Sequence, residues 1–341
     1  MKKYKVEDFG KLSDGQSVSL YTLENDLGDQ VKVSTYGACL VAFIVNDKDD
    51  RRNIVLSYDD ASLYEEDTSS NLGGLIGPFA NRISNGEFRL NEHFYKLKKN
   101  DGNNALHSSE LALNRRIWDV IDAKDHLVTF RITQDADNYP GKIEFRVTYE
   151  FNNQRQLKIS YRAKSTEDTY LNLTNHAYFN LNSSGKVNDE FLEVNADYYT
   201  PVDENLIPTG EVLSVKDTDF DFREEKLLDT VFNSEIEGLD NNFVLNKEEE
   251  NEFTYAARII DKDRGKQLVC YTTMPAVQVY TANAYVDVFG EDRTHEAVCL
   301  ETQFFPDSVN IMHFPSCKVK ADEVYSHETI FSYVDLKEWN K

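Results

Sequence analysis

Two histidines and one glutamate, far apart in the chain, carry the side chains needed to move protons. His176 lies in residues 171–181, which read LNLTNHAYFNL, with apolar residues alternating with Asn and Thr up to the histidine. A lone histidine in such a stretch is more often a structural residue than a catalytic one. His107 lies in the turn-rich segment GNNALHSS, and Glu301 follows an apolar run in AVCLETQFFPDS. Together, two imidazoles and a carboxylate can supply a general acid, a general base and a further hydrogen-bonding partner.

The segments that must position these residues read as β-strands. Residues 171–181 and residues 191–199 are each predicted to form one strand. Residues 143–150 alternate apolar with charged or polar side chains, turn at Asn152 and Asn153, and resume the alternation to residue 163. This pattern is typical of half-buried antiparallel strands joined as a hairpin. Helical periodicity favours only a short helix over residues 59–67, with Asp60 as its N-cap.

The sequence therefore predicts an all-β protein, a large antiparallel β-sandwich with few short helices. The near absence of periodic helices excludes folds in which strands and helices alternate. No internal repeat, low-complexity stretch or linker marks a boundary, so residues 1–341 are expected to form a single domain. In such a fold, loops and concave sheet faces are the places for function.

Charge restricts the class of ligand. The 341 residues are 40% hydrophobic and 28% charged, with a formal net charge of -23. A negative field of this size repels nucleic acid and anionic membrane surfaces and gives no help to a phosphorylated substrate. A neutral small molecule is indifferent to it. The expected partner is therefore neither nucleic acid nor membrane, and nothing in the sequence indicates the oligomeric state.

The cysteines and the N-terminal residues indicate the cellular compartment. The chain has no CxxC pair and no metal-ligand spacing, which argues against a disulfide framework or a zinc site. Cys39, Cys270, Cys299 and Cys317 are therefore expected to be free core thiols. The first residues lack an apolar segment of the kind that export signals contain, and no run approaches eighteen apolar residues. These features predict a cytoplasmic protein without a metal.

Two further segments offer polar side chains for a ligand. Residues 73–88 contain several glycines and present Arg82, which is either a surface residue or a guanidinium suited to vicinal hydroxyls or a carboxylate. Asp240 lies among turn-forming residues ahead of a predicted strand, where a surface carboxylate is the simpler interpretation. The residues alone leave both choices open.

Taken together, the motifs resemble those of the aldose 1-epimerases, or galactose mutarotases. The matching segments are NRI at 81–83, N-x-LH at 104–107, LTNHAYFNL at 173–181, LDNNF at 239–243, VQVYTAN at 277–283 and LETQFFPD at 300–307. They occur in the family's order over most of the chain, and the histidine and glutamate segments are the specific ones. The resemblance implies a single β-supersandwich domain with an open sugar cleft and no cofactor.

The resemblance also implies residue roles. His176 would be the proton donor and Glu301 the proton acceptor, with His107 as a third member of the catalytic group. Sugar contacts are implied for Asn81, Arg82, His107, Tyr178, Asp240 and Gln278. The chain departs from the family pattern at Ser108 and Ser109, where two glycines are usual, at Asn241, where histidine is frequent, and at Pro78, where many members have a basic residue. These departures bear on the shape of the pocket and on the preferred sugar.

The chemistry implied is the interconversion of α and β anomers of a free aldohexose such as D-galactose or D-glucose, with maltose as a further candidate. A carboxylate removes the proton of the C1 hydroxyl while an imidazolium protonates the ring oxygen, and the ring opens and recloses. The hypothesis assigns the two groups to opposite sides of the C1–O5 bond. It requires a charged His176 and an ionised Glu301 together, and therefore a bell-shaped pH profile.

Three other functions are compatible with parts of the sequence. A non-catalytic carbohydrate-binding module would bind sugar without accelerating its mutarotation. A hexose-phosphate epimerase would need several arginines converging on the phosphate, which the acidic charge disfavours. A glycoside hydrolase needs two carboxylates flanking the glycosidic bond, and Asp240 with Glu301 is a candidate pair.

Overall fold

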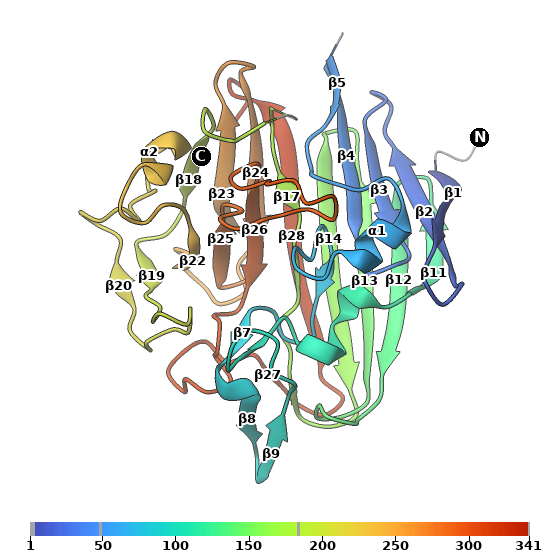
Figure 1. The fold of residues 1–341 in the computed structure, drawn as a ribbon, viewed down its shortest axis with the longest axis vertical. Helices are drawn as coiled ribbons and strands as arrows, with labels where there is room; N and C mark the ends of the chain where they lie inside the picture. Colours follow the sequence, from blue (N-terminus) through green and yellow to red (C-terminus); the bar gives the residue numbers. More distant parts are fainter. Residues whose placement is uncertain (1–3, 48–49, 183–184, 340–341) are drawn as a thin grey trace.

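A computed structural model describes residues 4–47, 50–182 and 185–339. Within these residues the chain forms three large antiparallel sheets and two short helices (Figure 1). The predicted all-β class with few short helices is confirmed. Helix α1 spans Ala61–Glu66, and the side chain of Asp60 accepts a hydrogen bond from the backbone N–H of Ser62, as the predicted N-cap does. Helix α2 spans Leu228–Phe232. No helix among the described residues is long and apolar enough to cross a membrane.

The largest sheet has nine strands within the described part of the chain. In spatial order these are β11 (Asp119–Lys124), β12 (Leu127–Gln134), β13 (Ile143–Phe151), β14 (Gln156–Ser165), β28 (Val324–Asp335), β24 (Lys266–Thr272), β23 (Thr254–Asp261), β18 (Phe191–Val194) and β21 (Lys226–Leu227). Strand β13 alternates buried and more exposed side chains along its length, as its sequence predicts. Strand β28, the last of these strands in sequence, lies between β14 and β24 near the middle of the sheet.

Two smaller sheets pack against this nine-stranded sheet. The five-stranded sheet comprises β1 (Tyr4–Lys11), β2 (Ser17–Glu24), β3 (Gln30–Ser34), β4 (Leu40–Asp47) and β5 (Asp50–Asn53). The six-stranded sheet has the order β17 (Tyr178–Phe179), β26 (Val298–Gln303), β25 (Ala276–Tyr280), β22 (Asp240–Val244), β19 (Tyr198–Thr200) and β20 (Leu213–Ser214). Rings meet across both interfaces, with Phe43 5.5 Å from Phe151 and Phe179 4.7 Å from Phe331 between centroids. The predicted sandwich therefore has one long layer covered by two shorter ones.

Short strand pairs link the loops between these sheets. They are β6 (Leu75–Ile76) with β16 (Thr174–Asn175), β7 (Arg82–Ile83) with β10 (Ala105–Leu106), β8 (Glu87–Leu90) with β9 (His93–Lys96), and β15 (Thr169–Tyr170) with β27 (Lys318–Val319). Two predicted strands are divided. Residues 171–181 contain β16 and β17, and residues 191–199 contain β18 and the start of β19. In both cases the two halves pair in different sheets, so one continuous strand was the wrong prediction.

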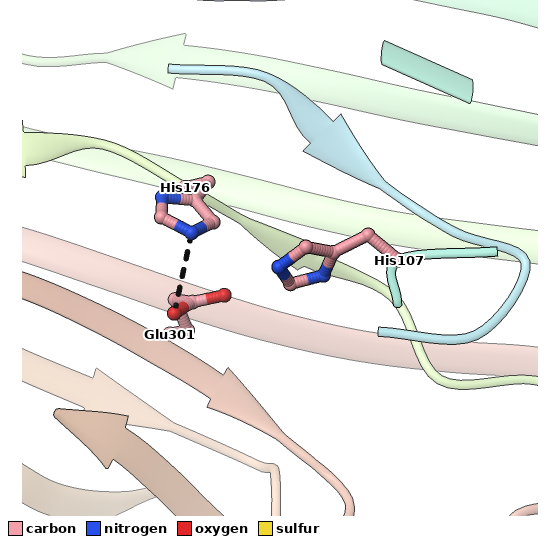
Figure 2. A group of neighbouring side chains, drawn as sticks. All are labelled: His107, His176 and Glu301. Atoms are coloured by element: carbon pink, nitrogen blue, oxygen red, sulfur yellow. Dashed lines mark ion pairs between the residues drawn. The ribbon is translucent and has the colours of Figure 1, made fainter. Parts of the chain in front are cut away.

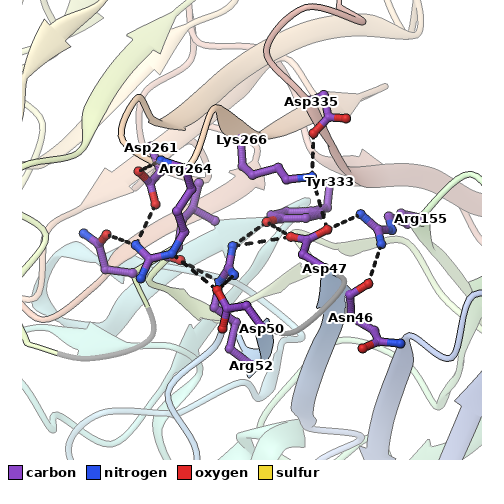
Figure 3. Close-up of polar contacts among 12 residues, drawn as sticks. Asn46, Asp47, Asp50, Arg52, Arg155, Asp261, Arg264, Lys266, Tyr333 and Asp335 are labelled. Carbon is purple, nitrogen blue, oxygen red and sulfur yellow. Dashed lines mark hydrogen bonds and ion pairs between the residues drawn. The ribbon is translucent and has the colours of Figure 1, made fainter.

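An ionic network ties the end of β4 to the nine-stranded sheet (Figure 3). The Asp47 carboxylate lies 2.7 Å from Arg155 Nη1 and 3.1 Å from Lys266 Nζ, and it accepts a 2.8 Å hydrogen bond from the hydroxyl of Tyr333. Arg155 also reaches Asp29, whose side chain is fully buried, at 3.0 Å. A buried charge that is paired in this way depends strongly on its partner.

We expect Arg155→Ala to lower the free energy of unfolding by about 3–5 kcal/mol, because it leaves the buried Asp29 carboxylate without its guanidinium. The measurement is the midpoint of urea denaturation at neutral pH. Arg131→Ala is the matched control, since Arg131 pairs with Asp119 in an exposed position and its loss should change stability by less than about 0.5 kcal/mol. Equal midpoints for the two variants would contradict this role of the network.

Candidate active site

His176 and Glu301 lie side by side, although 125 residues separate them in the sequence. His176 Nε2 is 3.6 Å from Glu301 Oε1, and the two side chains are only 7% and 3% exposed (Figure 2). Glu301 projects from β26, where it lies opposite Gln278 of β25. His176 lies between β16 and β17 and is held by main-chain hydrogen bonds to Gly73 and Gly74. The predicted pair is therefore brought together at ion-pair distance.

His107 approaches the same pair from the loop after β10. Figure 2 shows its ring turned toward His176 and Glu301, and the centroids of the two imidazoles are 5.4 Å apart. The backbone N–H of Asn81 donates a 3.1 Å hydrogen bond to His107 Nδ1. A neutral imidazole has one protonated nitrogen, so this bond assigns the proton of His107 to Nε2. His107 is therefore prepared to donate a hydrogen bond from Nε2.

A second group of polar side chains lies beside His107, His176 and Glu301. Arg82 Nε lies 2.7 Å from Asp101, and Arg82 Nη1 lies 3.6 Å from Asp240. Gln278 Nε2 donates a 2.7 Å hydrogen bond to the other oxygen of the Asp240 carboxylate. These contacts fix both the guanidinium and the carboxylate, which together offer donors and acceptors to a ligand rich in hydroxyls.

These residues surround a cavity of about 130 Å³. Its lining residues are Ser69, Ser70, Asn71, Asn81, Arg82, Leu106, His107, His176, Tyr178, Asp240, Tyr280 and Glu301. Seven of the eight residues singled out in the sequence line it. The eighth, Gln278, lies behind Asp240 and does not line the cavity. A cleft of this size and polarity suits a small polar molecule.

Sequence reasoning missed five lining residues. Tyr280 lies two residues after Gln278 on β25, so strand alternation in the VQVYTAN motif could have identified it. Nothing in the sequence marks Ser69, Ser70 or Asn71. Their loop is connected to the predicted site because the Tyr178 hydroxyl donates a 2.8 Å hydrogen bond to the Ser70 carbonyl. The Tyr178 ring in turn stacks on His176 with centroids 5.1 Å apart.

Burial changes the protonation of the pair. Burial and the nearby Asp240 carboxylate raise the pKa of Glu301 well above its ordinary value, and burial lowers the pKa of His176 to about 4. Burial and His176 likewise lower the pKa of His107. Burial therefore favours a protonated carboxyl group and neutral imidazoles. The charged pair expected from the sequence is the less favoured arrangement, because low-dielectric surroundings penalise charge.

The three side chains also form a possible set of metal ligands. Ligand atoms of His107, His176 and Glu301 lie within 4.8 Å of one another. A metal-binding histidine normally presents a free lone pair to the metal and donates its other N–H to an acceptor. His107 has the opposite arrangement, because its Nδ1 accepts the Asn81 N–H. The donor set therefore fits a hydrogen-bonding role better than metal binding.

Comparisons with known proteins identify the family and the fold. The family model for aldose 1-epimerase matches residues 19–332. Galactose mutarotase of Sus scrofa is 35% identical over 337 residues, covering 95% of this chain and 97% of that protein. Aldose 1-epimerase of Escherichia coli K12 is 31% identical, covering 94% and 96%. A solved structure of an aldose epimerase homologue from C. elegans superimposes with a TM-score of 0.86 at 30% identity, covering 92% of this chain and 98% of that one.

The chain belongs to the aldose 1-epimerase family, and its fold is that of the galactose mutarotases. Its activity is that of a mutarotase, the interconversion of the α and β anomers of a free sugar.

Proposed function

We propose that His176 is the proton donor and Glu301 the proton acceptor in this reaction, with D-galactose and D-glucose as substrates and maltose as a further candidate. The observation that carries the proposal is the 3.6 Å approach of His176 Nε2 to Glu301 Oε1 within a polar cleft. The two oxygens that exchange protons, O1 and O5 of the sugar, are both bonded to C1. A donor and an acceptor this close suit two neighbouring oxygens on one edge of the ring, instead of the opposite sides assumed from the sequence.

The reaction then proceeds through an open chain. Glu301 takes the proton of the C1 hydroxyl while His176 gives a proton to O5, so the C1–O5 bond breaks and C1 becomes an aldehyde. Rotation about C1–C2 presents the other face of the carbonyl. Ring closure reverses both transfers, with His176 taking back its proton and Glu301 returning the other. No electrons are exchanged, and the enzyme ends in its starting state.

Sugar binding supports the charged form that this mechanism uses. The C1 hydroxyl donates to Glu301, and O5 accepts from His176, so both contacts favour the ionised carboxylate and the imidazolium. The Arg82 guanidinium also acts to lower the pKa of Glu301. His107, Arg82 and Asn81 donate hydrogen bonds to the remaining hydroxyls, and the Asp240 carboxylate accepts from them, so the open chain is held until it recloses. Tyr178 supports the ring of His176, and Gln278 acts on the sugar through Asp240.

The domain organisation, the cellular location and the net charge of the protein bear on this function. We propose that residues 1–341 form one domain, because one large hydrophobic cluster includes Phe43, Phe145 and Leu300, which come from the three large sheets. A cytoplasmic location is supported by Cys39, Cys270, Cys299 and Cys317, which are buried free thiols. A neutral sugar is compatible with the net charge of -23.

The test follows the optical rotation of freshly dissolved α-D-galactose, α-D-glucose and α-maltose with and without the protein. We expect the decay of each preferred sugar to be faster than its spontaneous rate, and the ratio of kcat/KM values ranks the substrates. Decay of every sugar at the spontaneous rate would refute the assignment. A nitrophenyl galactoside in parallel should release no nitrophenol, because Asp240, the second carboxylate that lines the cleft beside Glu301, is already held by Arg82 and Gln278.

The pH profile gives a separate prediction. We expect kcat/KM to be bell-shaped, with an acidic limb near pH 4 and an alkaline limb well above the ordinary carboxyl pKa of 4.5. Below the first limb both groups are protonated and the acceptor is lost. Above the second limb both are deprotonated and the donor is lost. Catalysed rates measured by polarimetry, after subtraction of spontaneous mutarotation at each pH, give the two limbs. An alkaline limb at or below 4.5 would contradict the raised pKa of Glu301.

A further inference from the structure

The backbone that carries His107 adopts an unusual conformation. His107, Ser108 and Ser109 have successive φ values of 52°, 65° and 51°, all in the left-handed region. For residues with a side chain, this conformation costs roughly 1–2 kcal/mol per residue, whereas glycine adopts it freely. A run of three such residues persists only where the surrounding structure holds it in place.

The Ser108 side chain supplies that constraint. Its hydroxyl accepts a 2.7 Å hydrogen bond from the Phe79 N–H and donates a 2.9 Å hydrogen bond to the Phe79 carbonyl. Ser108 is 1% exposed and Phe79 is fully buried. One hydroxyl therefore satisfies both backbone polar groups of a residue that has no access to water. Leaving such groups unpaired costs about 1–3 kcal/mol each.

The two segments joined by Ser108 are the ones that orient the imidazole of His107. Two residues after Phe79, the Asn81 N–H donates to His107 Nδ1, and the His107 N–H donates a 3.1 Å hydrogen bond to the Asn81 carbonyl. Next to them, Arg82 of β7 pairs with Leu106 of β10. The hydrogen bonds between Ser108 and Phe79 hold the end of this strand pair in place. The distance between the Asn81 N–H and the imidazole of His107 therefore depends on the Ser108 hydroxyl.

We propose that Ser108 is a positioning residue for His107, whose hydroxyl holds the left-handed backbone against Phe79 so that the Nε2–H of His107 points at the sugar. This inference rests on the proposed role of His107 as a hydrogen-bond donor to the substrate. Without the hydroxyl, the segment is no longer held against Phe79, and the imidazole loses its alignment with Asn81. Misplacement of a substrate-orienting group by about 1 Å lowers the rate by up to about 10²-fold.

Four variants of the full chain test the proposal. Ser108→Ala removes the hydroxyl and keeps the strain, while Ser108→Gly removes the hydroxyl and relieves it. Both are expected to lower kcat/KM for α-D-galactose by about tenfold to a hundredfold. Ser109→Gly relieves the same kind of strain at the next residue, which does not line the cleft, and should keep wild-type activity. His107→Ala supplies the background for a double-mutant cycle with Ser108→Ala.

The cycle separates positioning from general stability. If Ser108 acts through His107, then Ser108→Ala should cause no further loss of kcat/KM in the His107→Ala background. Imidazole ¹⁵N NMR adds a second measurement, because wild-type His107 should show the Nε2–H tautomer and the Ser108 variants should lose that uniform signature while His176 keeps its own. Ser108→Gly carries the test if Ser108→Ala does not fold, since glycine removes the backbone strain.

The outcomes distinguish this inference from the proposed function. An equal loss from Ser108→Ala with and without His107 would mean a purely structural role and would overturn the inference. Wild-type activity of the Ser108 variants beside an impaired His107→Ala would overturn it as well, with the role of His107 intact. Wild-type activity of His107→Ala would refute the proposed role of His107 and this inference with it.

Discussion

Replacement of Glu301 by Gln is expected to lower kcat by about 10² to 10⁴-fold while leaving sugar binding nearly unchanged. The amide has the shape of the carboxyl group and can still accept a hydrogen bond from the C1 hydroxyl, but it has no basicity with which to take the proton. The site tolerates the change sterically, because Glu301 is enclosed in β26 and Gln is nearly isosteric. Burial and Asp240 already favour the uncharged carboxyl group of Glu301, so the neutral amide should not destabilise the folded protein.

The measurement for Glu301→Gln is the initial decay of optical rotation of α-D-galactose, corrected for the spontaneous rate. Calorimetric titration of the variant with galactose shows whether binding survives. Glu144→Gln is the control, since Glu144 lies on β13 in an ion pair with Arg146 and does not line the cleft. A Glu301→Gln variant with a wild-type kcat would remove the proposed base from the mechanism.

For His176→Asn we expect a loss of similar size, about 10² to 10⁴-fold in kcat. Asparagine retains a donor near the position of the imidazole but cannot transfer a proton at neutral pH. His176 also stacks on Tyr178 and lies 3.6 Å from Glu301, so part of the loss could be structural and must be measured separately. Thermal denaturation of the variant supplies that measurement.

His93→Asn is the matched control for His176→Asn, because His93 is exposed on β9. The double variant Glu301→Gln with His176→Asn should be little worse than either single variant, since a donor and an acceptor that act in one concerted step lose their joint function when either is removed. Fully additive losses would show that the two groups act in independent steps. An active His176→Asn protein would exclude the imidazole as the proton donor.

The fold class followed from local features of the sequence because those features are determined by neighbours along the chain. The alternation in residues 143–150 reflects one buried and one solvated face of β13, and the capping side chain of Asp60 bonds to a residue two positions away. Both signals are complete within a few residues. Nothing comparable indicates which strands become neighbours.

The stretch around His176 shows why continuity could not be predicted. Thr174 and Asn175 pair with β6, whereas Tyr178 and Phe179 pair with β26, and His176 lies at the change of partner. An alternating apolar pattern is satisfied equally by one long strand or by two short ones that turn from one sheet to another. The partners decide between them, and these come from distant parts of the chain.

The site itself was predicted largely through the motifs, and its finer geometry was not. The resemblance named His176 and Glu301 but gave no separation, and burial favours the neutral form of each group. Gln278 stays predicted to contact the sugar; its side chain donates a hydrogen bond to Asp240 and is not among the residues that line the cavity. The loop containing Ser69 and Asn71 reaches the cleft through tertiary contacts that no motif records.

The position of β28 means that the nine-stranded sheet can be completed only after the C-terminal strand has been synthesised. The strand follows every other member of the nine-stranded sheet in sequence, yet it supplies the bonds that join β14 to β24. Until β28 is synthesised, β14 and β24 therefore each have an unpaired edge, and such edges can pair with strands of other chains. A chain that ended before residue 324 would keep those two edges exposed, and exposed strand edges favour aggregation.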